Sequence, residues 1–553
     1  MKSKYKIFLF FTFLLALTLR FLNISKVPAC ISWDEASIGY NAYSILTTGK
    51  DEYGVSFPLL FKSIGDYKFP LLIYSLVPII KLFGLNVFSL RFLQALLGSI
   101  TVIVVFYLIK RLVNSSKVAL LTSFFLAISP WHIQFTREGV ELGISFFFTT
   151  LGILLFIKAI QEKKTGFLLS FIVFSLSLYT YFAERVFIPL ILVFSFIYFF
   201  KKIRSKFPNF LFSGIISSII LIPMFLSISF GGHQEKFLKT TIFGFRPSET
   251  YVQELLSQDS NLIAYNLFHN ESLEKVLAIS NHYLNHFSVN FLFLKGAYQD
   301  LRQYIYGMGV LYLFDLPLII LGLAAFLKKK NKYKNYLIFW LLIAPIPSAI
   351  TRDPVHARRS FHMLIPLITL SSFGVLTFVN YVKTVKSSYV KRAIYLISAL
   401  IFLYFFAFYL VSYHIISPTK TYKGASGFQC GYKELVEQIN SLEKDKYDRI
   451  IVDTSYQGPY IFFLFYEKYP PKSYQSQADL IQASVDELGE GPGYDKYVFR
   501  PIYWPEDRFL KNTLFAGPPE RLPEKDIDGS KAKIIDKVLF VTKEVAFVIV
   551  ETK

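Results

Sequence analysis

The chain has 553 residues, of which 53% are hydrophobic and 18% aromatic, and its mean hydropathy is +0.43. A soluble protein of this length would need a more polar surface, so the composition indicates a polytopic membrane protein and excludes an ordinary soluble enzyme. The formal net charge of +20 is compatible with nucleic-acid binding, but the Lys and Arg residues lie in short runs between apolar segments. Such runs contact anionic lipid headgroups and determine topology, so we expect membrane lipids and no nucleic acid as partners.

Apolar segments of roughly membrane-spanning length follow one another as far as residue 412. They lie near 7–22, 88–109, 118–134, 142–157, 166–182, 186–200, 209–228, 305–327, 335–350, 361–382 and 393–412. If the N-terminus is cytoplasmic, the basic runs all fall on the cytoplasmic side, at 1–6, 110–117, 161–164, 201–206, 328–334 and 383–392. This pattern predicts about eleven transmembrane helices in a cell (plasma) membrane, with a cytoplasmic N-terminus and an extracytoplasmic C-terminus.

Two apolar segments need separate assignment. The segment from Pro70 to Leu85 is short and interrupted by Pro78, and a crossing there would move every later basic run to the outside. We therefore expect an interfacial or re-entrant helix buried against protein. The N-terminal apolar stretch lacks a clean small-residue cleavage site and is expected to be an uncleaved first helix.

The chain divides into a transmembrane module and a soluble region. The module covers 1–412, with a first outer loop at 23–87 and a large outer loop at 229–304 that contains the amphipathic stretches QELLSQ and ESLEKVLAI. Residues 413–553 read as an extracytoplasmic α/β domain, with a helix at KELVEQINSLEK and strands at YDRIIVDT, 496–500, KVLFVT and VAFVIVET. This domain has no Gly-rich phosphate loop, so we assign it no chemistry. The two cysteines, Cys30 and Cys430, lie far apart in the chain and are expected to be free.

Acidic and basic residues gather in the predicted outer loops. Asp34 and Glu35 begin an amphipathic helix, where the helix dipole favours the ionised carboxylate that a general base requires. An N-cap with a first-turn acid is the structural alternative. Asp66 precedes Lys68 by two residues, and Lys68 could meet a phosphate as a point charge. An ion pair within the loop is the alternative there.

Three further outer segments carry arginines. Arg137, Glu138 and Glu141 occur in SPWHIQFTREGVELG at spacings that place them on one helix face, where a structural salt bridge is the alternative. Glu184 and Arg185 lie at another outer helix end. The segment TRDPVHARRSFHM holds Arg352, Asp353, His356, Arg358 and Arg359. Arginine matches phosphate oxygens with its planar fork, although anchoring in outer headgroups would also explain these residues. Together the loops suit an anionic lipid-linked donor attacked by a neutral acceptor, with the arginines stabilising the leaving lipid phosphate.

Several of these segments resemble a known family. The runs RFLNISKVPACISWDEASIGYNAY, GDYKFPLLIYSL, LFGLNVFSLRFLQALLGSITVIVVFYLIKRL and SPWHIQFTRE are similar to the protein O-mannosyltransferase-like glycosyltransferases of family 39, which have GT-C architecture and include the bacterial lipid A aminoarabinose transferase. The likeness covers about residues 1–200, weakens towards TRDPVHARRS and is absent from the soluble tail. It implies a polyprenyl-phosphate sugar donor, transfer on the extracytoplasmic side and inversion at the anomeric carbon.

The resemblance also implies roles for individual residues. Asp34 matches the family's base, with Glu35 beside it, and Asp66, Lys68, Pro70 and Leu71 match a second motif in which Phe69 replaces a proline. We predict Asp34, Glu35 and Asp66 as catalytic. Donor-phosphate ligands are predicted at Lys68, Arg137, Arg185, Arg352, Arg358 and Arg359, and further site candidates at Glu138, Glu141, Glu184 and His356. The acids would suffice for a divalent metal, which some relatives use, but we expect no metal or other cofactor.

The predicted function is therefore a membrane glycosyltransferase acting on a lipid, glycan or protein acceptor. A lipid-linked saccharide transporter or polymerase is the alternative, but transporters show inverted repeats and helices broken at mid-membrane, whereas the polar groups here cluster at one face. A phosphotransferase would use the same arginines together with a metal cluster or a nucleophile, and the sequence shows no obvious example of either.

Overall fold

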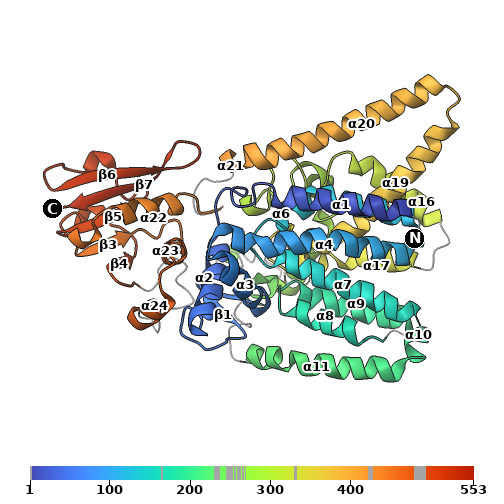
Figure 1. Cartoon of the computed structure of the whole chain (residues 1–553), viewed down its shortest axis with the longest axis horizontal. Coiled ribbons are helices and arrows are strands. Elements are labelled where there is room, and N and C mark those ends of the chain that lie inside the picture. The colour runs from blue at the N-terminus through green and yellow to red at the C-terminus, as the bar shows by residue number, and fades with distance from the viewer. Residues whose placement is uncertain are drawn as a thin grey trace.

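The computed structural model describes residues 3–162, 166–229, 237–238, 240–244, 253–254, 257, 263, 267, 270–328, 333–420, 428–478 and 493–553. It shows a body of long, roughly parallel helices and a smaller region that contains a β-sheet (Figure 1). The chain begins at the end of the helical body that lies away from the sheet, and it ends at the outer edge of the sheet. The predicted stretch QELLSQ lies largely outside the described residues, whereas ESLEKVLAI lies within helix α15 (Glu271–Asn285).

Every predicted span contains a helix. These helices are α1 (Ser3–Phe21), α4 (Val87–Val113), α5 (Ser116–Ile128), α7 (Leu142–Gln161), α8 (Leu168–Leu178), α9 (Glu184–Tyr198), α11 (Phe207–Ser229), α16 (Asp315–Lys328), α17 (Lys334–Ile343), α19 (Leu364–Thr384) and α20 (Ser388–Val411). Within the described ranges, five segments are long and apolar enough to cross a membrane: Val87–Val113, Leu142–Gln161, Phe207–Ser227, Phe361–Thr384 and Ser388–Ile416. The chain is thus a multi-pass helical membrane protein, and the number and direction of its crossings remain predictions.

Some predicted span boundaries were wrong. The span at 118–134 is divided between α5 and the short α6 (Pro130–Phe135), because Ser129 before Pro130 adopts an extended conformation. The span at 305–327 becomes helical only at Asp315. Proline and polar turns therefore end helices that an average of hydropathy cannot resolve.

The predicted first outer loop folds into helix α2 (Trp33–Thr48), the strands β1 (Phe61–Ser63) and β2 (Asp66–Lys68), and helix α3 (Pro70–Phe83). Helix α2 begins with a capping box in which Ser32 and Glu35 bond each other's backbone amides, and it ends at Gly49, whose φ of 70° suits glycine. Helix α3 buries Leu72, Ile73 and Leu76 and packs against α2. The sequence predicted an amphipathic helix here, but α2 is also covered by α23 (Pro459–Glu467) and α24 (Pro471–Gln477) of the C-terminal region.

The C-terminal region contains a five-stranded sheet with the order β4-β3-β5-β7-β6. The strands are β3 (Arg449–Val452), β4 (Tyr497–Phe499), β5 (Thr513–Gly517), β6 (Ala532–Leu539) and β7 (Val545–Thr552). Strand β3 is parallel to both β4 and β5, while β7 is antiparallel to β5 and β6. Helix α22 (Tyr432–Ser441) precedes β3, as the sequence predicted, but the central strand β5 was not predicted. One apolar core cluster joins this region to α2 and α3.

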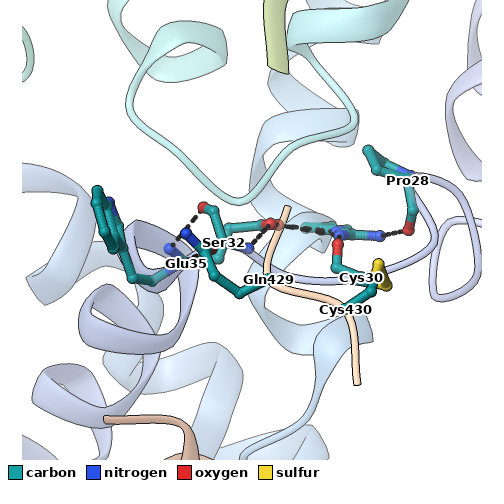
Figure 2. Close-up of a disulfide and its surroundings, with 8 residues drawn as sticks. Pro28, Cys30, Ser32, Glu35, Gln429 and Cys430 are labelled. Atoms are coloured by element: carbon teal, nitrogen blue, oxygen red, sulfur yellow. Dashed lines mark hydrogen bonds and ion pairs between the residues drawn. A yellow bond between two sulfur atoms is a disulfide. The ribbon is translucent and has the colours of Figure 1, made fainter. Parts of the chain in front are cut away.

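The two cysteines form a disulfide, so the prediction that they are free was wrong (Figure 2). Their Cα atoms lie 5.3 Å apart although 400 residues separate them in sequence. Separation along the chain does not limit a disulfide once the fold brings two segments together. The bond joins the predicted first outer loop covalently to the C-terminal region.

Candidate active site

A cavity of about 600 Å³ lies where the first turn of α2 and the β1–β2 hairpin meet five other segments, at 140–141, 181–182, 240, 300–302 and 356–359. Four acidic and four basic side chains line it, together with aromatic and small residues. The charged ones are Asp34, Asp66, Glu141, Asp300, Lys68, Arg302, Arg358 and Arg359, and the others include Trp33, Phe69, Tyr181 and His356. The cavity thus brings together the predicted acids and cations from loops that are distant in sequence.

Asp34 is the second residue of α2, so its side chain leaves the helix at the positive end of the dipole. Its Oδ1 bonds the ammonium of Lys68, and its Oδ2 lies 3.5 Å from Arg302 Nη1. Burial alone would raise the pKa of Asp34, but the charges of Lys68 and Arg302 hold it below the ordinary value. Asp34 is therefore an ionised carboxylate that remains 20% exposed to the cavity.

The β1–β2 hairpin explains why Asp66 and Lys68 act together. Its two-residue turn, Ile64-Gly65, has positive φ at both positions (51° and 64°), as a tight hairpin turn requires. Residues two apart on a strand point to the same face, so Asp66 and Lys68 share one face, with Oδ2 and Nζ 3.0 Å apart. Lys68 consequently lies between two carboxylates. Burial opposes its charge, but Asp34 and Asp66 raise the pKa of Lys68 above its ordinary value.

A second group of charges comes from the segments at 300–302 and 356–359. Arg302 is 3.3 Å from Asp300, and Arg358 bonds the buried Glu138. Despite burial, Arg302 and Arg358 lower the pKa of Asp300 to about 2. Burial raises the pKa of Glu138 to about 7, against the opposing charge of Arg358. These two arginines, which line the cavity, are thus held in place by acids.

Six predicted site residues do not line the cavity, namely Glu138, which pairs with Arg358, and the five described next. Glu35 is fully buried and pairs with Arg91 at 2.9 Å. Arg137 is also buried and donates to the carbonyls of Leu19, Arg20, Leu22 and Val27 at 2.7–3.0 Å. Glu184 bonds His362, Ser145 and Thr149 inside the helical body. Arg185 lies over the ring of Phe69, and Arg352 donates to the carbonyls of Leu238 and Thr241.

The prediction missed Asp300, Arg302 and Tyr181. Asp300 and Arg302 close the large outer loop just before a predicted span, in YQDLRQY, which is the same position that Arg358 occupies in its own loop. That charge pattern was a usable signal. Tyr181 lies in YTYFAERV, where the prediction considered only the charged residues Glu184 and Arg185.

The side chains that line the cavity can be compared with what a metal site requires. Among the described residues, no three His, Cys, Asp or Glu side chains are placed to hold a metal ion together. Two carboxylates of the cavity, Asp34 and Asp66, both bond Lys68, so an ammonium lies between them.

Part of the chain matches a known protein family in sequence. Residues 68–227 match the sequence model of the family described as dolichyl-phosphate-mannose-protein mannosyltransferase. That segment begins at Lys68 and includes Glu141 and Tyr181 of the cavity. None of the curated proteins matches the chain.

Solved structures show the same fold. The crystal structure of ArnT from Cupriavidus metallidurans bound to undecaprenyl phosphate has a TM-score of 0.57 and 11% identity, covering 99% of this chain and 98% of that one. The apo state of the same protein has a TM-score of 0.55 and 12% identity. For the oligosaccharyltransferase AglB from Archaeoglobus fulgidus, solved with an inhibitory peptide and a dolichol-phosphate, the TM-score is 0.49 at 14% identity. The match covers 84% of this chain but spans only 64% of AglB.

The similarity to ArnT extends over essentially the whole chain and, at this low identity, shows the fold. The family match covers residues 68–227, and both findings agree with the resemblance to protein O-mannosyltransferase-like glycosyltransferases noted in the sequence.

Proposed function

We propose that the protein is a glycosyltransferase that moves a sugar from a polyprenyl-phosphate carrier to a hydroxyl group of an acceptor, on the extracytoplasmic face and with inversion. The observation that carries the proposal is the cavity itself, in which an ionised Asp34 lies among Lys68, Arg302 and Arg358. The similarity in fold to ArnT, which was crystallised bound to undecaprenyl phosphate, supports a donor of this kind.

In the proposed reaction, the cations hold the phosphate of the donor while the acceptor hydroxyl faces Asp34. The hydroxyl oxygen forms a bond to the anomeric carbon, and the bond from that carbon to the phosphate oxygen breaks. The polyprenyl phosphate leaves with the electron pair, and Asp34 takes the hydroxyl proton. Charges placed at the leaving phosphate stabilise the transition state more than the ground state.

The ion pairs of Asp34 suggest how the donor prepares the base. Without donor, Lys68 and Arg302 lower the pKa of Asp34 and so weaken it as a base. A bound phosphate would draw these cations away from the carboxylate, which would raise the pKa of Asp34 towards the working pH. Asp66 would keep Lys68 charged and in place during the exchange.

The sidedness of the proposal rests on the disulfide. Disulfides persist in oxidising compartments, and Cys430 brings the C-terminal region to the loop that carries the cavity. We therefore propose a plasma-membrane protein with a cytoplasmic N-terminus and an extracytoplasmic C-terminal region. We also propose that no divalent metal takes part, so that chelator treatment leaves transfer unchanged.

The direct test is transfer by purified protein in detergent, with a panel of radiolabelled polyprenyl-phosphate sugars and a membrane extract as acceptor. Wild type and Asp34→Asn are compared, with Asp536→Asn, a change at an exposed acid on β6, as the matched control. Label that moves with wild type and Asp536→Asn but not with Asp34→Asn establishes the transferase and identifies the sugar. If no donor yields product and lipid-linked sugar instead crosses proteoliposomes, the protein is a transporter.

A further inference from the structure

The first turn of α2 is held from one side by the C-terminal region (Figure 2). The disulfide joins Cys30 to Cys430, and the side-chain oxygen of the neighbouring Gln429 accepts a hydrogen bond from the Trp33 amide at 3.1 Å. Trp33 is the first residue of the helix, and amides at this position have no partner within the helix. A side chain 396 residues away thus completes the helix start.

The same turn is held from the other side by the helical body. Arg91 of α4 donates to Glu35 Oε1 at 2.9 Å and to the carbonyl of Cys30 at 2.8 Å. Glu35 Oε1 also accepts a bond from the Gly139 amide at 2.8 Å. Asp34 lies between Trp33 and Glu35, so the position of its backbone is determined by both sets of contacts.

We propose that Gln429 is a positioning residue for Asp34 and that the Cys30–Cys430 disulfide holds Gln429 in register, so that the C-terminal region is a working part of the active site. This inference rests on the proposed function for its kinetic consequences. Its physical basis is independent of those consequences. Gln429 is only 4% exposed, and its neighbour Cys430 is bonded to Cys30, three residues before Trp33.

The proposal separates positioning from donor binding. The cations of the cavity lie on β2 and on the loops at 300–302 and 356–359. Among the described residues, Gln429 bonds the Trp33 amide and makes no hydrogen bond to these segments. Loss of the Gln429 bond should therefore leave donor KM unchanged. Displacement of a reacting group by a fraction of an ångström to 1 Å lowers turnover by roughly 10- to 100-fold.

The experiment uses the full chain with its disulfide intact and compares Gln429→Leu with Gln429→Glu. Leucine removes the acceptor, whereas glutamate retains an oxygen for the Trp33 amide and adds a negative charge near Asp34. The matched control is Gln475→Leu. Gln475 is another glutamine of the C-terminal region, and it bonds the opposite end of α2, at Ser44 and at the carbonyl of Asp51. The measurements are kcat and donor KM across pH, and hydrogen–deuterium exchange of the peptide that contains Trp33.

In Gln429→Leu we expect kcat to fall roughly tenfold or more at unchanged donor KM, with faster exchange at Trp33. Gln429→Glu should recover most of the kcat, and the acid limb of its pH profile should move to higher pH because a nearby carboxylate raises the pKa of Asp34. Gln475→Leu should retain the wild-type kcat. Wild-type turnover and wild-type exchange in Gln429→Leu would overturn the proposal.

The exchange measurement separates this inference from the proposed function. If wild type transfers no sugar at all, the proposed function fails, and faster exchange at Trp33 in Gln429→Leu alone then still supports the anchoring role. If Gln429→Leu does not fold, Gln429→Glu decides: an unchanged pH profile and a slower turnover in folded protein would contradict the positioning role.

Discussion

Asp34 and Glu35 are adjacent acids in one helical turn, yet the structure gives them opposite surroundings. Asp34 faces the cavity and bonds Lys68, which also bonds a second acid. Glu35 faces the interior, where it is fully buried with Arg91 and caps the helix. A carboxylate can react only if substrate can reach it, whereas a buried ion pair is costly to break. Asp34 is therefore the candidate base, and Glu35 stabilises the helix turn that carries it.

The largest expected effect comes from Asp34→Asn. Asparagine retains the shape of the side chain but accepts no proton, so we expect transfer to fall by roughly 100- to 10,000-fold. The thermal midpoint should change little, because Asp34 remains partly exposed to the cavity. Initial rates and thermal unfolding in detergent would measure both quantities. Transfer at the wild-type rate would remove Asp34 from the chemistry.

Glu35→Ala should show the reverse pattern. Its removal leaves the guanidinium of Arg91 buried without its acid and removes one side of the capping box. Loss of one partner of a buried ion pair costs about 3–5 kcal/mol, so we expect poor yield and a much lower thermal midpoint. The protein that does fold should retain measurable transfer. A variant that is stable but inactive would instead make Glu35 a catalytic group and reverse the comparison.

The contrast between the two acids also shows what sequence reasoning can reach. Hydropathy located a helix within every predicted span, and the charge and turn pattern located α2 and the acids and cations of most loops. Neither pattern could assign Asp34 and Glu35 to different faces, because the partners of Glu35 come from distant parts of the chain, at residues 91 and 139. The disulfide, the buried strand β5 and the contribution of Arg302 likewise depend on contacts between distant segments.

Arg358 tests whether the cavity-facing cations bind the donor. Because Arg358 also neutralises the buried Glu138, a fair test removes both charges, as Arg358→Ala with Glu138→Gln. We expect donor KM to rise about tenfold, in line with roughly 1.5 kcal/mol for a hydrogen bond to a charged group, and kcat to change less. The single variant Glu138→Gln serves as the control. An unchanged donor KM in the double variant would limit Arg358 to a structural role.

The smallest expected effect concerns Glu52, a third acid of the same outer loop. Glu52 is fully buried like Glu35, but its carboxylate accepts hydrogen bonds from uncharged groups, the side chains of Asn41 and Tyr460, at 3.0 Å. Burial raises the pKa of Glu52 to about 8, from an ordinary value of 4.5. The folded protein therefore keeps a proton that the unfolded chain releases.

The sign of the pH dependence follows from this difference. Between about pH 4.5 and 8 the folded state binds more protons than the unfolded state, so the contribution of Glu52 to stability is complete below pH 4.5 and is lost as pH rises to about 8. Glu52→Gln removes the titration, and its thermal midpoint should exceed that of wild type by a few degrees at pH 8 and by less at pH 5. The same Tm difference at both pH values would mean that Glu52 is already ionised in the folded protein. The contrast between Glu35, which is buried with a cation, and Glu52, which is buried among uncharged groups, would then lose its basis.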